Sequence, residues 1–177
     1  NRREDHALKM VELATTHLTR DEAQRFLTGQ AVGVFFESPP MLWYGESPLS
    51  YACVFGLRRL VHAMLTTGLV HMDGAPGEIT GFYPLHAVVA NGNRGMFDFL
   101  LNSLPKDLRP TTSQLTATGR MASLHCALMT PLQLTAKRGV RVMFQHIMRA
   151  ELTTIQWVWG PVTQYQTLLD GIDSSCQ

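Results

Sequence analysis

The sequence predicts an all-α fold built from stacked helical hairpins. Three segments begin with Pro-Leu and then keep the same spacing of key residues. Their prolines and leucines are Pro48-Leu49, Pro84-Leu85 and Pro131-Leu132. A glycine follows each proline by eight residues, at Gly56, Gly92 and Gly139. Large apolar residues follow each proline by 13, 16 and 17 residues: Val61, Met64 and Leu65; Phe97, Leu100 and Leu101; and Phe144, Ile147 and Met148. Six shared positions predict a structural repeat rather than unrelated hairpins.

Each segment carries the start and stop signals of a helix pair. Proline fits the first helical turn, where its missing N–H has no partner to lose. Ser47 and Thr130 precede two of the prolines and can cap those helices. The glycine then allows the chain to leave the first helix and reverse. The second segment also reads Pro-Leu-His, which is typical of ankyrin repeats, so we expect an ankyrin repeat solenoid with long finger loops.

His86 has a structural interpretation within this pattern. In ankyrin repeats the histidine after Pro-Leu hydrogen-bonds to the backbone of the neighbouring turn and ties repeats together. The other two units have Ser50 and Gln133 at this position. We therefore expect His86 to stabilise the stack rather than to bind a ligand.

The domain organisation follows from the same spacing. Residues 1–40 are predicted to be the end of a preceding repeat plus a connecting loop, with helices over 5–16 and after Thr19. Residues 41–177 are predicted to contain repeat units starting near Pro48, Pro84 and Pro131, and a degenerate unit near Pro161. The fingers fall at 66–80 and at 102–129, and the second is unusually long. The alternation of Ile155 with the two tryptophans that follow suggests a short extended piece before the last unit.

Composition places the chain among globular proteins of a reducing compartment. Of its 177 residues, 45% are hydrophobic and 16% are charged, and the net charge is +1. This balance gives no argument for nucleic acid or for a membrane surface as a partner. The longest apolar run, from Tyr51 to Met72, is interrupted by charged residues, so no transmembrane helix is expected here. Three widely spaced cysteines argue against a disulfide framework, and Cys53 is expected to be buried. Because the chain starts at Asn1 without a signal-peptide pattern, we expect it to be part of a longer protein.

No motif indicates catalysis or a metal site. The histidines are scattered, and no pair has the His-Glu-x-x-His arrangement. Neither a phosphate-binding Gly-x-x-x-x-Gly-Lys nor a Gly-x-Ser-x-Gly nucleophile elbow occurs. We therefore expect neither an enzyme nor a cofactor.

Several motifs in order resemble one ankyrin family. They are Tyr44-Gly45-Glu46-x-Pro48-Leu49-Ser50, Val142 to Met148, Gln156-Trp157-x-x-Gly160-Pro161-Val162 and Leu168-Leu169-Asp170-x-Ile172-Asp173-Ser174. This order resembles the cytosolic ankyrin domain of the vanilloid subfamily of transient receptor potential channels (TRPV), over about residues 40–174.

The resemblance implies a function and partners. It implies a homotetrameric, calcium-permeable cation channel in the cell membrane, with this domain on the cytoplasmic side serving subunit assembly and regulation. It also implies calmodulin or ATP as regulators, and Glu46 is the position that matches the family ligand site. The alternative for Glu46 is an exposed acid near a helix start.

Two further features indicate a binding function. Trp43, Trp157 and Trp159 suggest an interface, because tryptophan is enriched at contact hot spots. The alternative is that these side chains cover the apolar seam between repeats. Basic residues near the inter-helix turns form a solvated face or a site for an acidic partner: Arg58, Arg59, Lys137, Arg138 and Arg141. For the whole chain, the alternative function is a soluble ankyrin-repeat scaffold.

Overall fold

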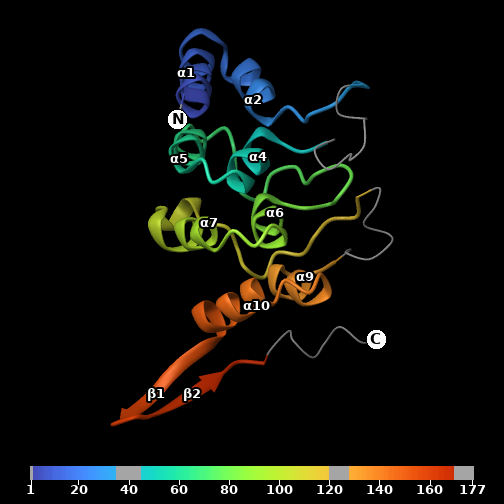
Figure 1. Ribbon diagram of the computed structural model, residues 1–177. Helices are drawn as coiled ribbons and strands as arrows, with labels where there is room; N and C mark the ends of the chain where they lie inside the picture. Colours follow the sequence, from blue (N-terminus) through green and yellow to red (C-terminus); the bar gives the residue numbers. More distant parts are fainter. Residues whose placement is uncertain (1, 35–44, 120–127, 170–177) are drawn as a thin grey trace.

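The chain forms a stack of helix pairs that ends in a β-hairpin (Figure 1). The computed structural model describes residues 2–34, 45–119 and 128–169. The helices are α1 (Arg2–His17), α2 (Arg20–Thr28), α4 (Pro48–Val54), α5 (Arg58–Thr66), α6 (Pro84–Ala90), α7 (Arg94–Asp98), α9 (Pro131–Lys137) and α10 (Arg141–Ile147). α7 and α10 each continue into a wider π-type turn, Phe99–Ser103 and Met148–Leu152, and a short 3-10 turn spans Lys106–Leu108. The strands are β1 (Thr153–Trp159) and β2 (Val162–Thr167).

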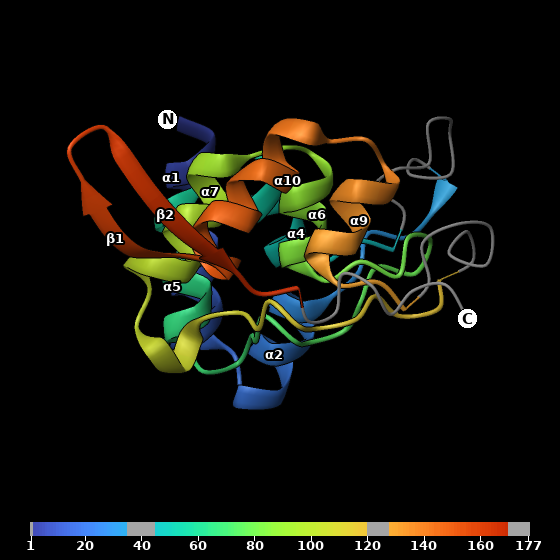
Figure 2. The ribbon, with the colours of Figure 1, turned by 90° about the horizontal axis from the view of Figure 1, so that it is seen from below.

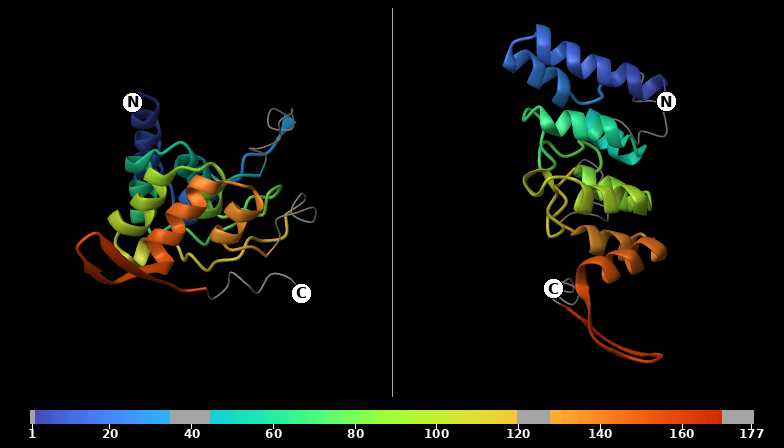
Figure 3. Two further views of the ribbon diagram at one scale, coloured as in Figure 1. Left: turned by 60° about the horizontal axis from the view of Figure 1, so that its bottom comes forward. Right: turned by 90° about the vertical axis from the view of Figure 1, so that its left-hand side faces the viewer.

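The helices form two parallel columns (Figures 1 and 3). The inner column contains α2, α4, α6 and α9, each packed on the next, and lies nearer the finger loops (Figure 2). The outer column contains α1, α5, α7 and α10. In this column Nε2 of His146 on α10 lies 2.6 Å from Oδ1 of Asp98 on α7. This stacking of helix pairs is compatible with an ankyrin-like fold.

The local signals in the sequence act as predicted. Ser47 accepts a hydrogen bond from the backbone N–H of Ser50, which caps α4. Thr19 and Thr130 each form a reciprocal capping box with the third residue of their helices. The caps satisfy backbone N–H groups that a short helix leaves free. The helix starts predicted after Thr19, Ser47 and Thr130 are therefore confirmed, whereas the helix predicted over 5–16 begins earlier, at Arg2.

The core lies between the columns and between successive pairs. Seven of the nine apolar residues at the shared offsets are buried: Val61, Met64, Leu65, Phe97, Leu100, Leu101 and Ile147. Phe144 and Met148 are half-buried, because they lie on α10 and its continuation, the last helical segment described in the stack. Cys53 is completely buried, as predicted, and burial raises the pKa of its thiol.

The chain is not all-α, which corrects the prediction for its C-terminal part. β1 and β2 pair as an antiparallel hairpin around Gly160 and Pro161, where a degenerate repeat unit was expected. Gly160 has φ of +55°, which suits a two-residue hairpin turn. The extended piece predicted from the alternation at Ile155 is β1. No described helix is long and apolar enough to cross a membrane.

The finger loops are hydrogen-bonded to one another. The backbone N–H of Glu78 donates to the carbonyl of Gly45 (3.2 Å), and that of Ala117 donates to the carbonyl of Gly81 (2.9 Å). Gly81 has φ of +70°, and a Cβ there would overlap the carbonyl oxygen of Ala117. The fingers therefore form a continuous layer rather than independent loops.

Two glycine substitutions distinguish the energetic cost of the close contact at Gly81 from the cost of backbone strain. Gly68 has nearly the same φ, +66°, but open space around it. Gly68→Ala should therefore cost only the left-handed strain, about 1 kcal/mol, and Gly81→Ala about 2 kcal/mol more. Urea unfolding followed by far-UV circular dichroism measures both. Equal costs for the two variants would contradict the packed finger layer.

Candidate functional site: a buried glutamate and an exposed hairpin

The repeat-defining residues occupy equivalent places in the three pairs. Pro48, Pro84 and Pro131 are the first residues of α4, α6 and α9. Leu49 and Leu85 are buried, and Leu132 is half-buried. Gly56, Gly92 and Gly139 have φ of +69°, +66° and +68° and end the first helix of each pair.

His86 is a buried link between α6 and the following finger. Its Nε2 lies 3.1 Å from the carbonyl oxygens of both Gln114 and Met129. Carbonyl oxygens only accept, so Nε2 carries the proton and donates to both. Among the described residues, Nδ1 is buried without a partner. Burial lowers the pKa of His86 to about 4, although the two backbone hydrogen bonds oppose the shift. His86 is thus a neutral donor that holds the middle and the C-terminal end of the long finger.

This histidine predicts a defined pH dependence of stability. Its pKa is about 4 in the folded protein and 6.5 ordinarily, so the unfolded chain binds more protons between these values. The contribution of His86 to the free energy of unfolding should therefore be highest above pH 6.5 and fall by roughly 3 kcal/mol as the pH drops to 4.

Urea titrations at several pH values test this dependence. His86→Gln removes the titrating group and should flatten the curve in this window. An unchanged slope in that variant would assign the pH dependence to other groups.

Glu46 is buried, which corrects the expectation of an exposed acid. Its side chain is 6% exposed, and Oε1 accepts a hydrogen bond from Thr80 Oγ1 at 2.8 Å. A Cβ at Gly77 would overlap Oε1, so the finger backbone closes directly over the carboxylate. Among the described residues, Glu46 Oε2 and Ser50 Oγ have no hydrogen-bond partner.

The buried carboxylate connects a helix start to a distant finger. Desolvation raises the pKa of Glu46, while the nearby hydroxyls of Thr80 and Ser50 oppose the shift. Glu46 is also one of the residues that line a hollow of about 390 Å³, with Gln30, Ser47 and Tyr51. Its position in this lining makes Glu46 a candidate ligand contact.

Glu46→Gln should stabilise the protein at pH 7. Because the folded pKa lies above the ordinary value of 4.5, the native state binds the extra proton and stability falls as the pH rises through the folded pKa. Glutamine avoids the buried charge and keeps an acceptor for Thr80. The gain in melting temperature should disappear below pH 4.5, where both forms are neutral.

Thr80→Val is the matched control for the glutamate prediction. It removes a donor to a charged acceptor and should cost about 2 kcal/mol at pH 7, and less in acid. Calorimetry at pH 7 and pH 4 measures both variants. A glutamine variant less stable than the parent at pH 7 would show that the carboxylate is stabilising.

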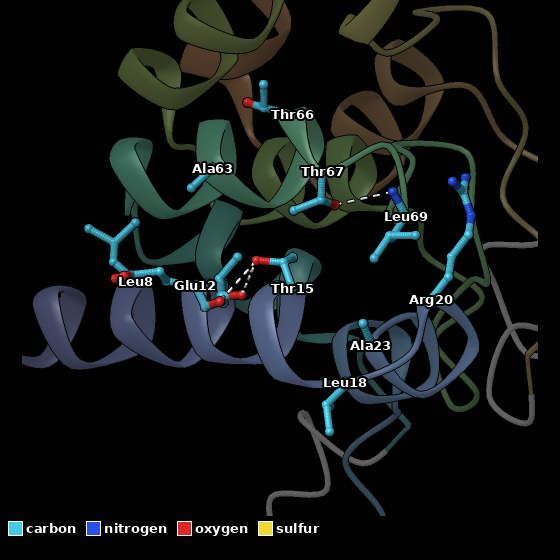
Figure 4. Close-up of a pocket in the computed structure, with 11 residues that line it drawn as sticks. Leu8, Glu12, Thr15, Leu18, Arg20, Ala23, Ala63, Thr66, Thr67 and Leu69 are labelled. Carbon is cyan, nitrogen blue, oxygen red and sulfur yellow. Dashed lines mark hydrogen bonds between the residues drawn. The ribbon is translucent and has the colours of Figure 1, made fainter.

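A hollow of about 560 Å³ lies among α1, α2 and α5 (Figure 4). Its threonine hydroxyls are used locally: Thr15 donates to Val11 and Glu12, Thr66 to His62, and Thr67 to Met64. Of its two charged lining residues, Glu12 is paired with Lys9 at 2.9 Å and Arg20 is the other. Most of the lining is therefore aliphatic or already paired, which favours packing between the helices over binding of a ligand.

The hairpin exposes large apolar side chains. Trp157 is 48% exposed and Trp159 is 76% exposed, so neither covers the seam between helix pairs. Ile155, Val158, Val162 and Tyr165 are also exposed. The hairpin projects from the end of the stack (Figures 1 and 3). Trp43 lies outside the described residues.

A β-bulge gives the hairpin two apolar faces. Ile155 pairs with Tyr165, but Trp157 pairs with Gln164, so Gln156 is the extra residue. The shift places Trp157, Trp159 and Val162 on one face and Ile155, Val158 and Tyr165 on the other. Such a patch on a two-stranded sheet is typical of an interaction site. Sequence reasoning identified the tryptophans but missed Tyr165, whose signal was the Gly-Pro turn between two β-prone runs.

The chain is similar to curated channel proteins. It is 28% identical over 177 aligned residues to human transient receptor potential cation channel subfamily V member 5, covering 93% of this chain and 21% of that protein. Human subfamily V member 6 is 28% identical over 162 residues, and rat member 6 is 29% identical over 159 residues, each covering 84% of this chain and 19% of the relative. The chain therefore spans about a fifth of the length of these relatives. No family model and no solved structure matches it. The resemblance indicated by the sequence motifs is thus confirmed: the chain is related to a segment of transient receptor potential cation channels of subfamily V.

Proposed function

We propose that this chain is the cytoplasmic ankyrin repeat domain of a TRPV-like cation channel and serves subunit assembly. The similarity to subfamily V members supports the channel, and the exposed hairpin carries the assembly role. In this proposal the helix pairs are ankyrin repeats, and the chain belongs to a longer, calcium-permeable, homotetrameric protein of the cell membrane.

The hairpin suits a contact between subunits. A two-stranded sheet with apolar side chains on both faces is marginally stable alone in water. One end of the hairpin is attached to the stack through the π-type turn Met148–Leu152. A neighbouring subunit that covers Trp157 and Trp159 would bury the kind of side chain that dominates binding energy.

Regulation is a second part of the proposal. The hollow beside Glu46 supports binding of a small ligand, as the resemblance implies for ATP, and calmodulin is the protein regulator implied in the same way. A soluble ankyrin scaffold is the alternative, and it would need no neighbouring subunit for the hairpin.

Substitution of both tryptophans tests assembly. Trp157→Ala with Trp159→Ala in the full-length protein should weaken tetramer formation at least tenfold, because each truncation at a hot spot costs 1 kcal/mol or more. Light scattering after size-exclusion chromatography measures the oligomer. Helical circular dichroism of the present chain should be unchanged.

The matched control removes two apolar side chains elsewhere. Leu18 and Phe26 are 41% and 46% exposed, and their replacement by alanine should leave the tetramer intact. A fully tetrameric double tryptophan variant would contradict the assembly role of the hairpin.

A further inference from the structure

One edge of the stack carries a repeated arginine that helix stability does not explain. Arg58, Arg94 and Arg141 each follow their repeat proline by ten residues and each begin the second helix of a pair. A cation at the start of a helix is opposed by the helix dipole. The same unfavourable choice in three successive units indicates selection for something outside the helix.

The three turns that carry these arginines lie close together. Asn93 Nδ2 donates to the carbonyl of Val54 at 3.4 Å, which joins the first turn to the second. A Cβ added at Gly92 would lie 3.6 Å from Val140 Cγ1, so the second turn lies near the third. The cations therefore form one line along the stack. The basic ridge is defined as Arg58, Arg59, Arg94, Lys137, Arg138 and Arg141, all of them exposed.

Two members of the basic ridge are used within the stack. Arg58 Nη2 donates to the carbonyl of Gly95 at 2.8 Å, and its guanidinium lies 5.6 Å from the centre of the Phe99 ring. Arg59 Nη1 lies 2.9 Å from Asp5 Oδ1. These contacts hold neighbouring outer helices together.

The other four cations are available to a partner. Within the described part of the chain, the side chains of Arg94, Lys137, Arg138 and Arg141 have no hydrogen-bond or ion-pair partner. The three turns, 54–59, 90–95 and 136–142, contain no acidic residue. An ordinary solvated face mixes charges of both signs, and this edge does not. The net charge of +1 for the whole chain conceals this local excess.

We propose that the basic ridge binds an extended acidic segment of a partner protein, which runs along the stacked turns. Guanidinium groups match carboxylates in bidentate geometry, and a line of them fits carboxylates spaced along a strand. Glycine and asparagine make up six of the thirteen other residues of these turns, whereas a membrane-binding surface needs several large apolar side chains to insert. Phe55, the aromatic residue of the first turn, lies against Tyr51 with ring centres 4.4 Å apart.

Binding of a labelled twelve-residue oligoglutamate peptide tests the basic ridge. Fluorescence anisotropy with the 177-residue chain should show binding that weakens as salt rises. The triple variant Arg94→Gln, Arg138→Gln and Arg141→Gln should bind about tenfold more weakly. These substitutions spare the inter-helix contacts of Arg58 and Arg59, so helical circular dichroism should not change.

A second triple variant with the same change in net charge is the control. Arg20→Gln, Arg25→Gln and Lys106→Gln alter exposed cations outside the basic ridge and should leave affinity within about twofold of the parent. If both triple variants weakened peptide binding equally, the loss of affinity would be due to net charge alone, and the proposal would be overturned. Absence of peptide binding, or binding to phosphatidylserine vesicles in its place, would also overturn it.

Discussion

Burial of apolar faces between successive helix pairs is the constraint on which this structure depends. The inner helices α4, α6 and α9 each have seven residues, too few for a stable isolated helix in water. Each pair becomes stable because its neighbours cover residues such as Val61, Phe97 and Ile147. Polar links add specificity at the same junctions: His86 joins α6 to the next finger, and Asp98 joins α7 to His146. Finger geometry and the line of exposed arginines both follow from this one-dimensional stacking.

Features with a local cause could be predicted from the sequence. Pro-Leu after a capping residue, glycine eight residues later and apolar residues at fixed offsets are all read within one unit. The helix starts, the caps and most of the buried positions followed from these signals. Phe144 and Met148 are more exposed than the pattern predicts, because the pattern describes the middle of a stack and these residues lie near its end.

Features that depend on contacts between distant parts of the chain were either not predicted from the sequence or predicted wrongly. Glu46 has the sequence context of an exposed acid, but residues 77–80 of the next finger cover it. The sequence predicts a degenerate repeat in place of the hairpin, because Gly160 and Pro161 suit the turn of a repeat as well as the turn of a hairpin. The pairing of β1 with β2, and the bulge that moves Ile155 off the face of the two tryptophans, depend on a register that neither strand specifies alone.

We propose that a stack of this kind, ending in an exposed hairpin, belongs to a cation channel. The sequence of the parent transcript downstream of the codon for Gln177, with its hydropathy profile, tests this proposal. We expect six segments of about 20 apolar residues, each long enough to cross a bilayer. A continuation that is polar throughout, or that adds only further repeats, would contradict the channel and leave an interaction scaffold.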